Sequence, residues 1–490
     1  MNGIVTLDVG TTHIKGYLFS ESGEKWNQVI HPTSFLRLGN GISEIDPDQV
    51  LGDISYILKS VINVSFKEVT IAAIVVSGMA CSFIPVSRQG KPLYPCICWN
   101  DQRSTAVENM PDLERIVHYI QQYPLPMYLP FRMKWFSEHH PEIFSEAYKW
   151  LNLTDYIVYH LSAEKIFMTD YSQASRTMLF NSIAKQWNIP VADHFKIPLE
   201  KLPEPKPAGT VIGKLDAAFL MHSGYRNTQL IVGGHDHMFA ALAGGIHHPS
   251  VALNSTGTSE ALVMPYLQDT SFSFVHEECN LESHVLDNNF FVVGYVASTG
   301  RIMEWANQLF QLFKWEQHLN LETVIDRIPT LPLYIPSGRR MQPSRTGRFI
   351  ELQPLHDGRD FSLSVMEGLS FETRALLEHL NTKLSIQTDL LRLVGGSSKS
   401  INFLQMKSSI LQKPIEVIHD VDMTSLGGYL LCGLALHYFR DVNLMAKELL
   451  EQQRRTFLEP DQAMSKRFEI RYHHYLQERR AQDGKNIEGR

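Results

Sequence analysis

The stretch LIVGGHDHMFAALAGGIHH, residues 230–248, lies at the midpoint of the 490-residue chain. An apolar run leads into a double glycine, then the triplet His235-Asp236-His237, then small apolar residues at helical spacing up to Gly244-Gly245. A strand that runs through glycines into a helix brings Asp236 to the carboxyl edge of a sheet, where open α/β sheets bind ligands. There Asp236 can accept a proton or hold a metal-bound water, whereas an ordinary N-cap does neither. The stretch alone leaves both interpretations open.

Composition bounds the class of protein. At 490 residues the chain is too long for one core, so we expect two or three domains. An apolar fraction of 44% and a charged fraction of 20% are those of an ordinary soluble protein, and a net charge of −7 argues against nucleic-acid binding. The longest uncharged stretch, residues 70–87, is broken by glycine and proline, which predicts a buried strand and turn and no membrane helix.

The cysteines and the chain ends indicate the compartment. Five cysteines occur without a CxxC pair, and the opening MNGIVTLDVG has no basic start and no apolar core. We therefore expect a cytoplasmic protein. The final Ile-Glu-Gly-Arg resembles a protease recognition sequence, so residues 483–490 are set aside as a tail.

The opening stretch GIVTLDVGTTHIKGYLFS, residues 3–20, predicts two strands joined by a tight turn. Its backbone N–H groups, hydroxyls and ammonium group suit phosphate oxygens, and come from Gly10, Thr11, Thr12 and Lys15. Asp8, just before the turn, can hold the water shell of a Mg²⁺ ion. A plain surface hairpin is the alternative.

The second half of the chain repeats this pattern. Residues 251–262, VALNSTGTSEAL, again predict a strand, a Gly-Thr-Ser turn and a strand. Two such hairpins, each opening one half of the chain, suggest a duplicated architecture whose lobes hold a nucleotide between them. Residues 209–214, GTVIGK, lack the Walker spacing, and no GxGxxG loop occurs, so the nucleotide site is of a third type.

A short segment, WNDQRS at residues 99–104, follows a predicted strand. Its aromatic face, carboxylate and guanidinium, from Trp99, Asp101 and Arg103, are typical of a site for a small polyhydroxylated ligand. An Asp–Arg surface pair beside a core tryptophan is the alternative.

Another strand, double glycine and helix are predicted at residues 390–412. Gly395 and Gly396 would let a flat heterocycle lie against the backbone, near a helix N-terminus. Glycine pairs also simply allow close packing of helix and strand, so both interpretations stand. Residues 130–160 are predicted to be helical, with Pro141 at the start of the second helix.

Taken in order, these segments resemble the FGGY carbohydrate kinase family over nearly the whole chain. The shared motifs are DVGTTHIKG (8–16), WNDQRS (99–104), TDYSQASRT (169–177), GGHDH (233–237), STGTS (255–259), EGLSFETR (367–374) and GGSSKS (395–400). The resemblance implies an α/β fold with two ribonuclease-H-like, actin-type lobes, at 1–246 and 247–482, and a deep cleft between them.

The resemblance also implies roles for individual residues. Asp236 corresponds to the general base that takes the proton of the sugar hydroxyl and, with Asp8, to the metal-binding carboxylates. The first hairpin corresponds to the β/γ-phosphate site. The implied nucleotide residues of the second half are Gly257, Thr258 and Ser259 on a phosphate hairpin, and Gly395, Gly396 and Ser397 in the adenosine motif. Trp99, Asp101 and Arg103 correspond to a sugar-side segment.

Several positions depart from the family pattern. Xylulose and gluconate kinases usually carry Met-His in the stretch that here reads Gly-Met-Ala-Cys-Ser at 78–82, with Cys81 near the histidine position, and we expect Cys81 to border the substrate. Glycerol kinases have an Arg-Glu pair there, which this chain lacks, although TDYSQASRTMLF resembles their version of that segment. His235 is uncommon, and can contact the sugar or tune Asp236. The adenosine motif departs at Ser400 and at 407–409.

These features predict ATP- and Mg²⁺-dependent phosphorylation of a hydroxyl of a small sugar, with a ketopentose such as xylulose favoured over a related polyol or sugar acid. The alternative from another class is a non-catalytic nucleotide-binding sensor or scaffold of the actin/Hsp70 type, which would need neither Asp236 nor the 99–103 segment. The expected partner is a small molecule, with no nucleic acid and no membrane, and a homodimer remains open.

Overall fold

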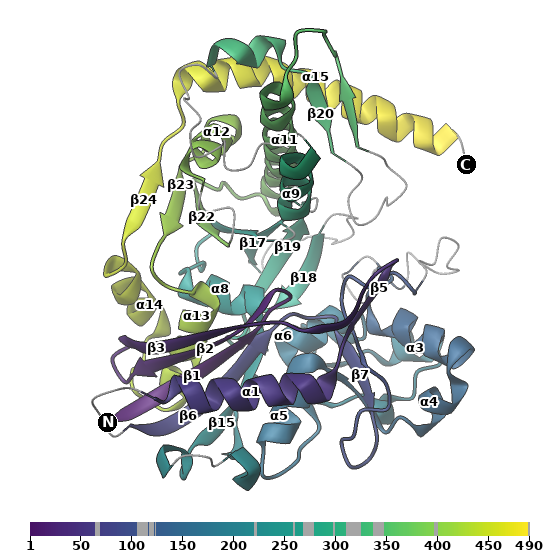
Figure 1. Cartoon of the computed structure of the whole chain (residues 1–490), viewed down its shortest axis with the longest axis vertical. Coiled ribbons are helices and arrows are strands. Elements are labelled where there is room, and N and C mark those ends of the chain that lie inside the picture. The colour runs from purple at the N-terminus through teal and green to yellow at the C-terminus, as the bar shows by residue number, and fades with distance from the viewer. Residues whose placement is uncertain are drawn as a thin grey trace.

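The computed structural model describes residues 1–63, 69–104, 116, 122, 124–219, 223–257, 260–267, 279–296, 299–309, 325–336, 347–395 and 400–488. Two large sheets, each flanked by helices, form two lobes that meet near the middle of the molecule (Figure 1). The boundary proposed at residues 246 and 247 falls between helix α8 (Asp236–Ala243) and strand β16 (Val251–Thr256).

The sheet of the N-terminal lobe has six strands in the order β14-β15-β6-β1-β2-β3. Strands β1, β2 and β3 form an antiparallel meander, and β6 and β15 continue the sheet parallel to β1. The strands are β1 (Asn2–Val9), β2 (His13–Ser20), β3 (Lys25–Pro32), β6 (Thr70–Gly78), β14 (Val211–Lys214) and β15 (Gln229–His235).

The sheet of the C-terminal lobe has seven strands in the order β18-β19-β17-β16-β22-β23-β24. Here β16, β17 and β19 are antiparallel neighbours, and β22 and β23 continue parallel to β16. Beside β16, the strands are β17 (Glu260–Tyr266), β18 (Cys279–Ser283), β19 (Phe290–Tyr295), β22 (Leu390–Val394), β23 (Ile415–Ile418) and β24 (Arg455–Leu458). The central strands of both sheets thus share one arrangement, as a duplicated architecture requires.

A smaller five-stranded sheet in the order β4-β5-β8-β7-β9 extends the N-terminal lobe and carries the segment after Cys98. Its strands are β4 (Phe35–Gly39), β5 (Ile42–Ile45), β7 (Phe83–Val86), β8 (Cys96–Ile97) and β9 (Lys149–Asn152). Strand β9 corrects the prediction of continuous helix after Pro141. The chain returns to helix at Leu153, where the Asp155 carboxylate accepts the backbone N–H of the N-cap residue Asn152 at 3.1 Å.

The helices bury one face each against these sheets. Helix α1 illustrates why they form where they do: the Asp46 side chain accepts the N–H groups of Asp48 and Gln49, Pro47 is the first helical residue, and an apolar face turns to the core. The main helices of the N-terminal lobe are α1 (Pro47–Val61), α3 (Leu129–His139), α4 (Pro141–Glu146), α5 (Leu153–Leu161), α6 (Tyr171–Ala174), α7 (Ile189–His194) and α8. Those of the C-terminal lobe are α9 (Thr299–Leu309), α11 (Gly358–Leu384), α12 (Ile401–Leu411), α13 (Met423–Ala435), α14 (Val442–Glu451) and α15 (Gln462–Glu488).

Helices α8 and α13 lie between the two large sheets (Figure 1) and share one apolar core with strands of both. Their approach is close, because a Cβ on Gly427 would lie 2.1 Å from the Phe239 carbonyl oxygen. A Cβ on Gly428 would lie 3.0 Å from Thr6 of β1. Helix α8, which begins at Asp236, is therefore fixed by both lobes. No helix within the described ranges is long and apolar enough to cross a membrane.

Candidate active site

Three parallel strands of the N-terminal lobe end at the same edge of the sheet. In the register of β1, β6 and β15, Asp8 is level with Ser77 and Gly234, and the next row contains His235. The chain then enters α8, whose first residue is Asp236 and whose N-cap is His235. The strand, the helix and the position of Asp236 at the carboxyl edge are as predicted, and Asp236 is not the N-cap of the helix.

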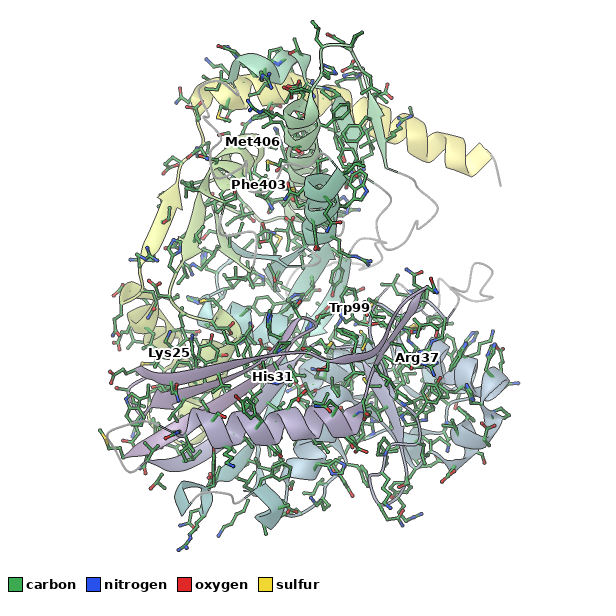
Figure 2. All side chains as sticks on the ribbon, in the orientation of Figure 1. Lys25, His31, Arg37, Trp99, Phe403 and Met406 are labelled. Carbon is green, nitrogen blue, oxygen red and sulfur yellow. The ribbon has the colours of Figure 1, made fainter. Side chains whose placement is uncertain are left out.

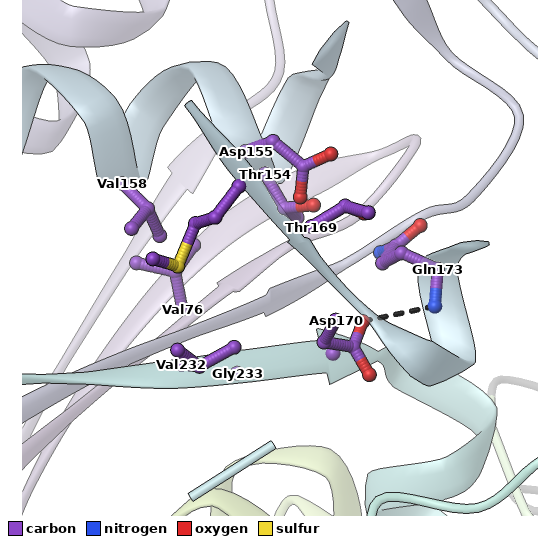
Figure 3. Close-up of a pocket in the computed structure, with 11 residues that line it drawn as sticks. Val76, Thr154, Asp155, Val158, Thr169, Asp170, Gln173, Val232 and Gly233 are labelled. Atoms are coloured by element: carbon purple, nitrogen blue, oxygen red, sulfur yellow. Dashed lines mark hydrogen bonds between the residues drawn. The ribbon is translucent and has the colours of Figure 1, made fainter. Parts of the chain in front are cut away.

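The double glycine before this triplet is required by packing. A Cβ on Gly233 would lie 1.7 Å from the Val76 carbonyl oxygen, and one on Gly234 would lie 2.6 Å from Ser172 Oγ. Beside them is a small cavity bordered by α5, β10 (Met168–Asp170) and α6 (Figure 3). Strand β15 therefore fits between β6 and α6 only because residues 233 and 234 are glycines.

A short hydrogen-bond chain fixes the end of β15. The Asp170 carboxylate caps α6 by accepting the N–H group of Gln173 (Figure 3). It also accepts the N–H and the hydroxyl of Ser172, each at 2.7 Å. Ser172 Oγ in turn accepts the backbone N–H of His235 at 2.8 Å. Asp170 and Ser172 thus hold the backbone immediately before Asp236.

The Asp236 carboxylate is oriented by its two neighbours. Its Oδ1 accepts the His237 backbone N–H at 2.7 Å and lies 3.1 Å from His235 Nε2. Burial opposes ionisation, but His237 and His235 more than offset it, so the pKa of Asp236 lies well below its usual range. The carboxylate is therefore ionised at neutral pH, with its side chain 28% exposed.

Behind His235 lies a buried ionic cluster contributed by both lobes. His235 Nδ1 is 3.4 Å from Glu282 Oε2, an ionic contact longer than a well-formed hydrogen bond. Glu282, on β18, also accepts Arg176 at 2.6 Å and the Tyr295 hydroxyl at 2.9 Å. Although burial alone would lower the pKa of His235, Asp236 and Glu282 raise it to about 9. His235 is thereby held as a cation between two carboxylates.

The first hairpin supplies a second carboxylate and a lysine. Lys15 Nζ lies 3.3 Å from Asp8 Oδ2 and 2.7 Å from Asp422 Oδ2. Asp422 is the N-cap of α13, which belongs to the C-terminal half of the chain. Lys15 therefore joins the hairpin to α13, and a phosphate bound at the hairpin would compete with these carboxylates for it.

The residues fit a magnesium ion at Asp8. Its Oδ1 is buried and has no hydrogen-bond partner in the part of the chain that the structure describes, and burial raises the pKa of the carboxyl to about 7 despite Lys15. The charge of Asp236 raises it further. A cation would satisfy that oxygen and relieve the repulsion, and Mg²⁺ accepts one or two carboxylates together with water and phosphate oxygens.

The turn of the hairpin contacts the sugar-side segment directly. Trp99 lies on the side of its lobe that faces the other lobe (Figure 2), and its Nε1 donates to Thr11 Oγ1 at 3.0 Å. Gly10 donates its N–H to the His13 carbonyl, and the Thr12 carbonyl accepts the Thr33 N–H, so the turn is anchored at both ends. The phosphate and sugar predictions thus fall on adjoining surfaces.

The comparisons with known proteins bear on this geometry. Residues 3–243 match the N-terminal domain, and residues 252–436 the C-terminal domain, of the FGGY family of carbohydrate kinases. The chain belongs to the FGGY family of carbohydrate kinases. It is 25% identical to a xylulose kinase of Staphylococcus epidermidis over 90% of this chain and 89% of that protein. It is 23% identical to a glycerol kinase of Lactobacillus delbrueckii subsp. bulgaricus over 90% of each.

Solved structures confirm the predicted fold. The ligand-bound xylulose kinase of Lactobacillus acidophilus superposes with a TM-score of 0.86 at 21% identity, covering 98% of both chains. A gluconate kinase from the same organism gives 0.85 at 21% identity, again over 98% of both. The chain is therefore an α/β protein of two actin-type lobes and a carbohydrate kinase that uses ATP, which sets aside the alternative of a non-catalytic nucleotide-binding protein.

Three predicted substrate residues of this FGGY kinase lie in tightly bonded surroundings. Asp101 is buried, and its oxygens accept the Ser43 N–H, Arg103 and Arg132. Arg103 also donates to Glu44 at 2.6 Å. Cys81 is fully buried in a left-handed conformation, φ 58°, with its Sγ donating to the Arg176 carbonyl. We infer that Cys81, Asp101 and Arg103 support the segment that contains Trp99. Their roles as direct sugar contacts stay predictions.

The nucleotide predictions of the C-terminal lobe are partly described. Gly257 is exposed at the end of β16, and Gly395 follows β22 with φ 105°, where a Cβ would lie 2.3 Å from the Thr256 carbonyl oxygen. Both glycines thus lie at the carboxyl edge of the second sheet, and Gly395 is required by close packing. Thr258, Ser259, Gly396 and Ser397 lie outside the described residues.

The departures in the adenosine motif have structural partners. Lys407 is fully buried and bonded to Glu260 at 2.5 Å. Ser408 Oγ donates to the carbonyls of Lys413 and Leu458, and Ser409 Oγ accepts the Asp461 N–H. These side chains attach α12 to β17, to the end of β24 and to the residue before α15.

Sequence reasoning missed several members of the site. Glu282 and Asp422 lie outside every motif, and the motif TDYSQASRT (169–177) gave no predicted role for Ser172 or Arg176. Glu282 gives a weak signal as the one acidic residue of a short strand. Asp422 gives none, because its partner Lys15 is 407 positions away.

Proposed function

We propose that this kinase transfers the γ-phosphoryl group of ATP to a hydroxyl of a small sugar, with Asp236 as the general base. The observation that carries the proposal is the carboxylate itself: Asp236 is ionised and bonded through Oδ1 at the sheet edge it shares with Asp8 and the phosphate hairpin. Phosphoryl transfer asks mainly for positioning and charge neutralisation. Asp236 orients the hydroxyl and accepts its proton as the new P–O bond forms.

The remaining residues neutralise and enclose the phosphates. Lys15 and the backbone of residues 10–12 would contact the β- and γ-phosphates, and Trp99 would face the sugar. Asp8 and Asp236 are the residues that we propose hold Mg²⁺, which when bound offsets the negative charge of the phosphate oxygens. Gly257 and Gly395 would border the nucleotide from the other lobe, together with the predicted residues 258–259 and 396–397.

A ketopentose such as xylulose is the favoured substrate class. The first similar proteins are named xylulose kinases, and the Arg-Glu pair expected of glycerol kinases is missing from residues 78–82. A sugar acid or a polyol is the second candidate, supported by the similarity to a gluconate kinase structure and to glycerol kinases. A panel of ketopentoses, pentitols, tetritols, sugar acids and glycerol, scored by ADP release and by detection of the phosphorylated product, separates them.

The test of the base is Asp236→Asn, assayed with the best substrate of that panel. We expect the variant to fold, to bind ATP and to lose roughly 10²–10⁴ in kcat, the usual weight of a general base. Asp441→Asn is the matched control, because Asp441 also stands at a helix start, that of α14, and there accepts the backbone N–H groups of Asn443 and Leu444. Turnover of Asp236→Asn close to that of the control would refute the assignment.

A further inference from the structure

Three consecutive residues at the start of α8 form a second possible ligand set. The donor atoms of His235, Asp236 and His237 all lie within 4.8 Å of one another, and the two imidazole centroids are 4.9 Å apart. In a continuous strand, neighbouring side chains point to opposite faces. Because β15 ends at His235 and α8 begins at Asp236, the backbone turns here and the three side chains converge.

One ring nitrogen of this set has no partner among the residues that the structure describes. His237 Nδ1 is buried and makes no hydrogen bond with any described residue. A buried polar nitrogen without a partner costs about 1–3 kcal/mol, so it is normally paired with protein, water or an ion. The position of this nitrogen beside a carboxylate and a second imidazole favours a cation.

The chemistry of the donor set selects the kind of cation. Mg²⁺ takes oxygen ligands, so Asp8 and the phosphates suit it and imidazole does not. Two imidazoles and one carboxylate are the donors of Zn²⁺, Co²⁺ and Ni²⁺, with bonds of about 2.0–2.2 Å for Zn²⁺. Only a neutral imidazole binds a metal, so His235, a cation in the metal-free protein, releases its proton to solvent when the ion binds. The set of His235, Asp236 and His237 therefore prefers a different kind of metal ion from the magnesium site, although the two sites share Asp236.

We propose that His235, Asp236 and His237 bind one divalent transition-metal ion of the zinc class when sugar is absent, and that this ion inhibits the kinase. Inhibition follows because a carboxylate bonded to such an ion no longer accepts the sugar proton. This second step rests on the proposed role of Asp236, whereas binding of the ion does not.

The binding test uses metal-free, full-length protein without nucleotide, titrated with Co²⁺ and followed by visible absorption. We expect one saturable band per chain, displaced by Zn²⁺ because Zn²⁺ binds the same donors. His237→Asn should weaken Co²⁺ binding by at least about tenfold, the smallest loss usually seen even for outer-sphere partners. His247→Asn is the matched control, since His247 is exposed just beyond the same helix, and it should leave the titration unchanged.

Two results would overturn the site: a missing Co²⁺ band, or a band that His237→Asn leaves as strong as in the control. Should His237→Asn fail to fold by circular dichroism, Asp236→Asn serves as the second variant with the same expected loss. The inhibition test then buffers free Zn²⁺ at constant Mg·ATP, and His237→Asn should resist inhibition at least about tenfold better than His247→Asn. Equal inhibition of both would overturn the inhibitory role. The Co²⁺ titration needs no turnover, so it decides the site even if the protein phosphorylates no sugar in the panel.

Discussion

Lys407→Met removes one charge from a fully buried ion pair in the C-terminal lobe. Both side chains of the Lys407–Glu260 pair are 0% exposed, and their atoms are 2.5 Å apart. Glu260 also accepts hydrogen bonds from Asn254, Thr299 and Thr373 at 2.8–2.9 Å. Methionine keeps the length and apolar contacts of the lysine stem, so the variant isolates the loss of the charge.

The magnitude follows from what remains around Glu260. Removing one partner of a buried pair costs about 3–5 kcal/mol, because the other charge stays buried. Its three remaining hydrogen bonds stabilise the Glu260 carboxylate, which brings the expected cost to the lower end, about 3 kcal/mol. For a lobe of this size, about 1 kcal/mol lowers the melting temperature by roughly 2–4 °C, so we expect a decrease of about 6–12 °C.

The assay is calorimetry together with tryptophan fluorescence, because two lobes need not unfold in a single transition. The double variant Glu260→Gln/Lys407→Met leaves no uncompensated charge and should regain most of the lost stability. A Lys407→Met variant as stable as the parent would refute the reasoning, and so would a double variant that melts as low as the single one.

Two further predictions concern Glu282 and Asp422, which contact His235 and Lys15 of the candidate site. Glu282→Gln removes the carboxylate beside His235 and should lower kcat by about 10–100-fold through a misplaced Asp236, with little change in the KM of the sugar. Glu367→Gln, which breaks an equally buried pair with Arg471 far from the site, should lower stability only, and equal kcat losses in both variants would contradict a positioning role. Asp422→Asn frees Lys15 while an asparagine still caps α13, so the KM of ATP should fall by about 2–5-fold, the weight of a part-exposed ion pair. An ATP titration that shows a higher KM would mean that the pair does not compete with phosphate.

Much of the fold was predictable because its signals are local. The hairpins at residues 3–20 and 251–262 depend on strand-forming residues on either side of a glycine turn, and the two strands of each pair antiparallel as predicted. Strand β15 and helix α8, at the midpoint of the chain, were predictable for the same reason. The helix predicted after Pro141 failed at β9, because pairing with β7 overrides a local helical pattern, and that pairing is invisible in a single stretch of sequence.

The candidate site was predictable only where a motif lies on one segment. Asp8, Lys15 and Asp236 belong to such segments, whereas Asp422 and Glu282, which pair with Lys15 and His235, come from distant parts of the chain. Lys407 is a second residue whose partner is distant in the sequence. In sequence Lys407 is a departure from the family's adenosine motif. In the structure its charge is balanced by Glu260, which begins the second strand of the hairpin at 251–262. The effect of a residue that departs from a family pattern therefore cannot be inferred until the residue that pairs with it is known.

The low pKa of Asp236 determines what kind of base it would be in the proposed reaction. A carboxylate held ionised by two histidines is a weak base, and a reaction that needed early removal of a proton would be slowed by it. A phosphoryl-transfer transition state is loose, so the attacking hydroxyl becomes acidic only as its bond to phosphorus forms. A weak base in a fixed orientation is sufficient at that stage, and an ionised one is always ready to accept the hydrogen bond of the hydroxyl. The arrangement of His235, His237 and Glu282 around Asp236 therefore favours orientation of the substrate over strength of the base.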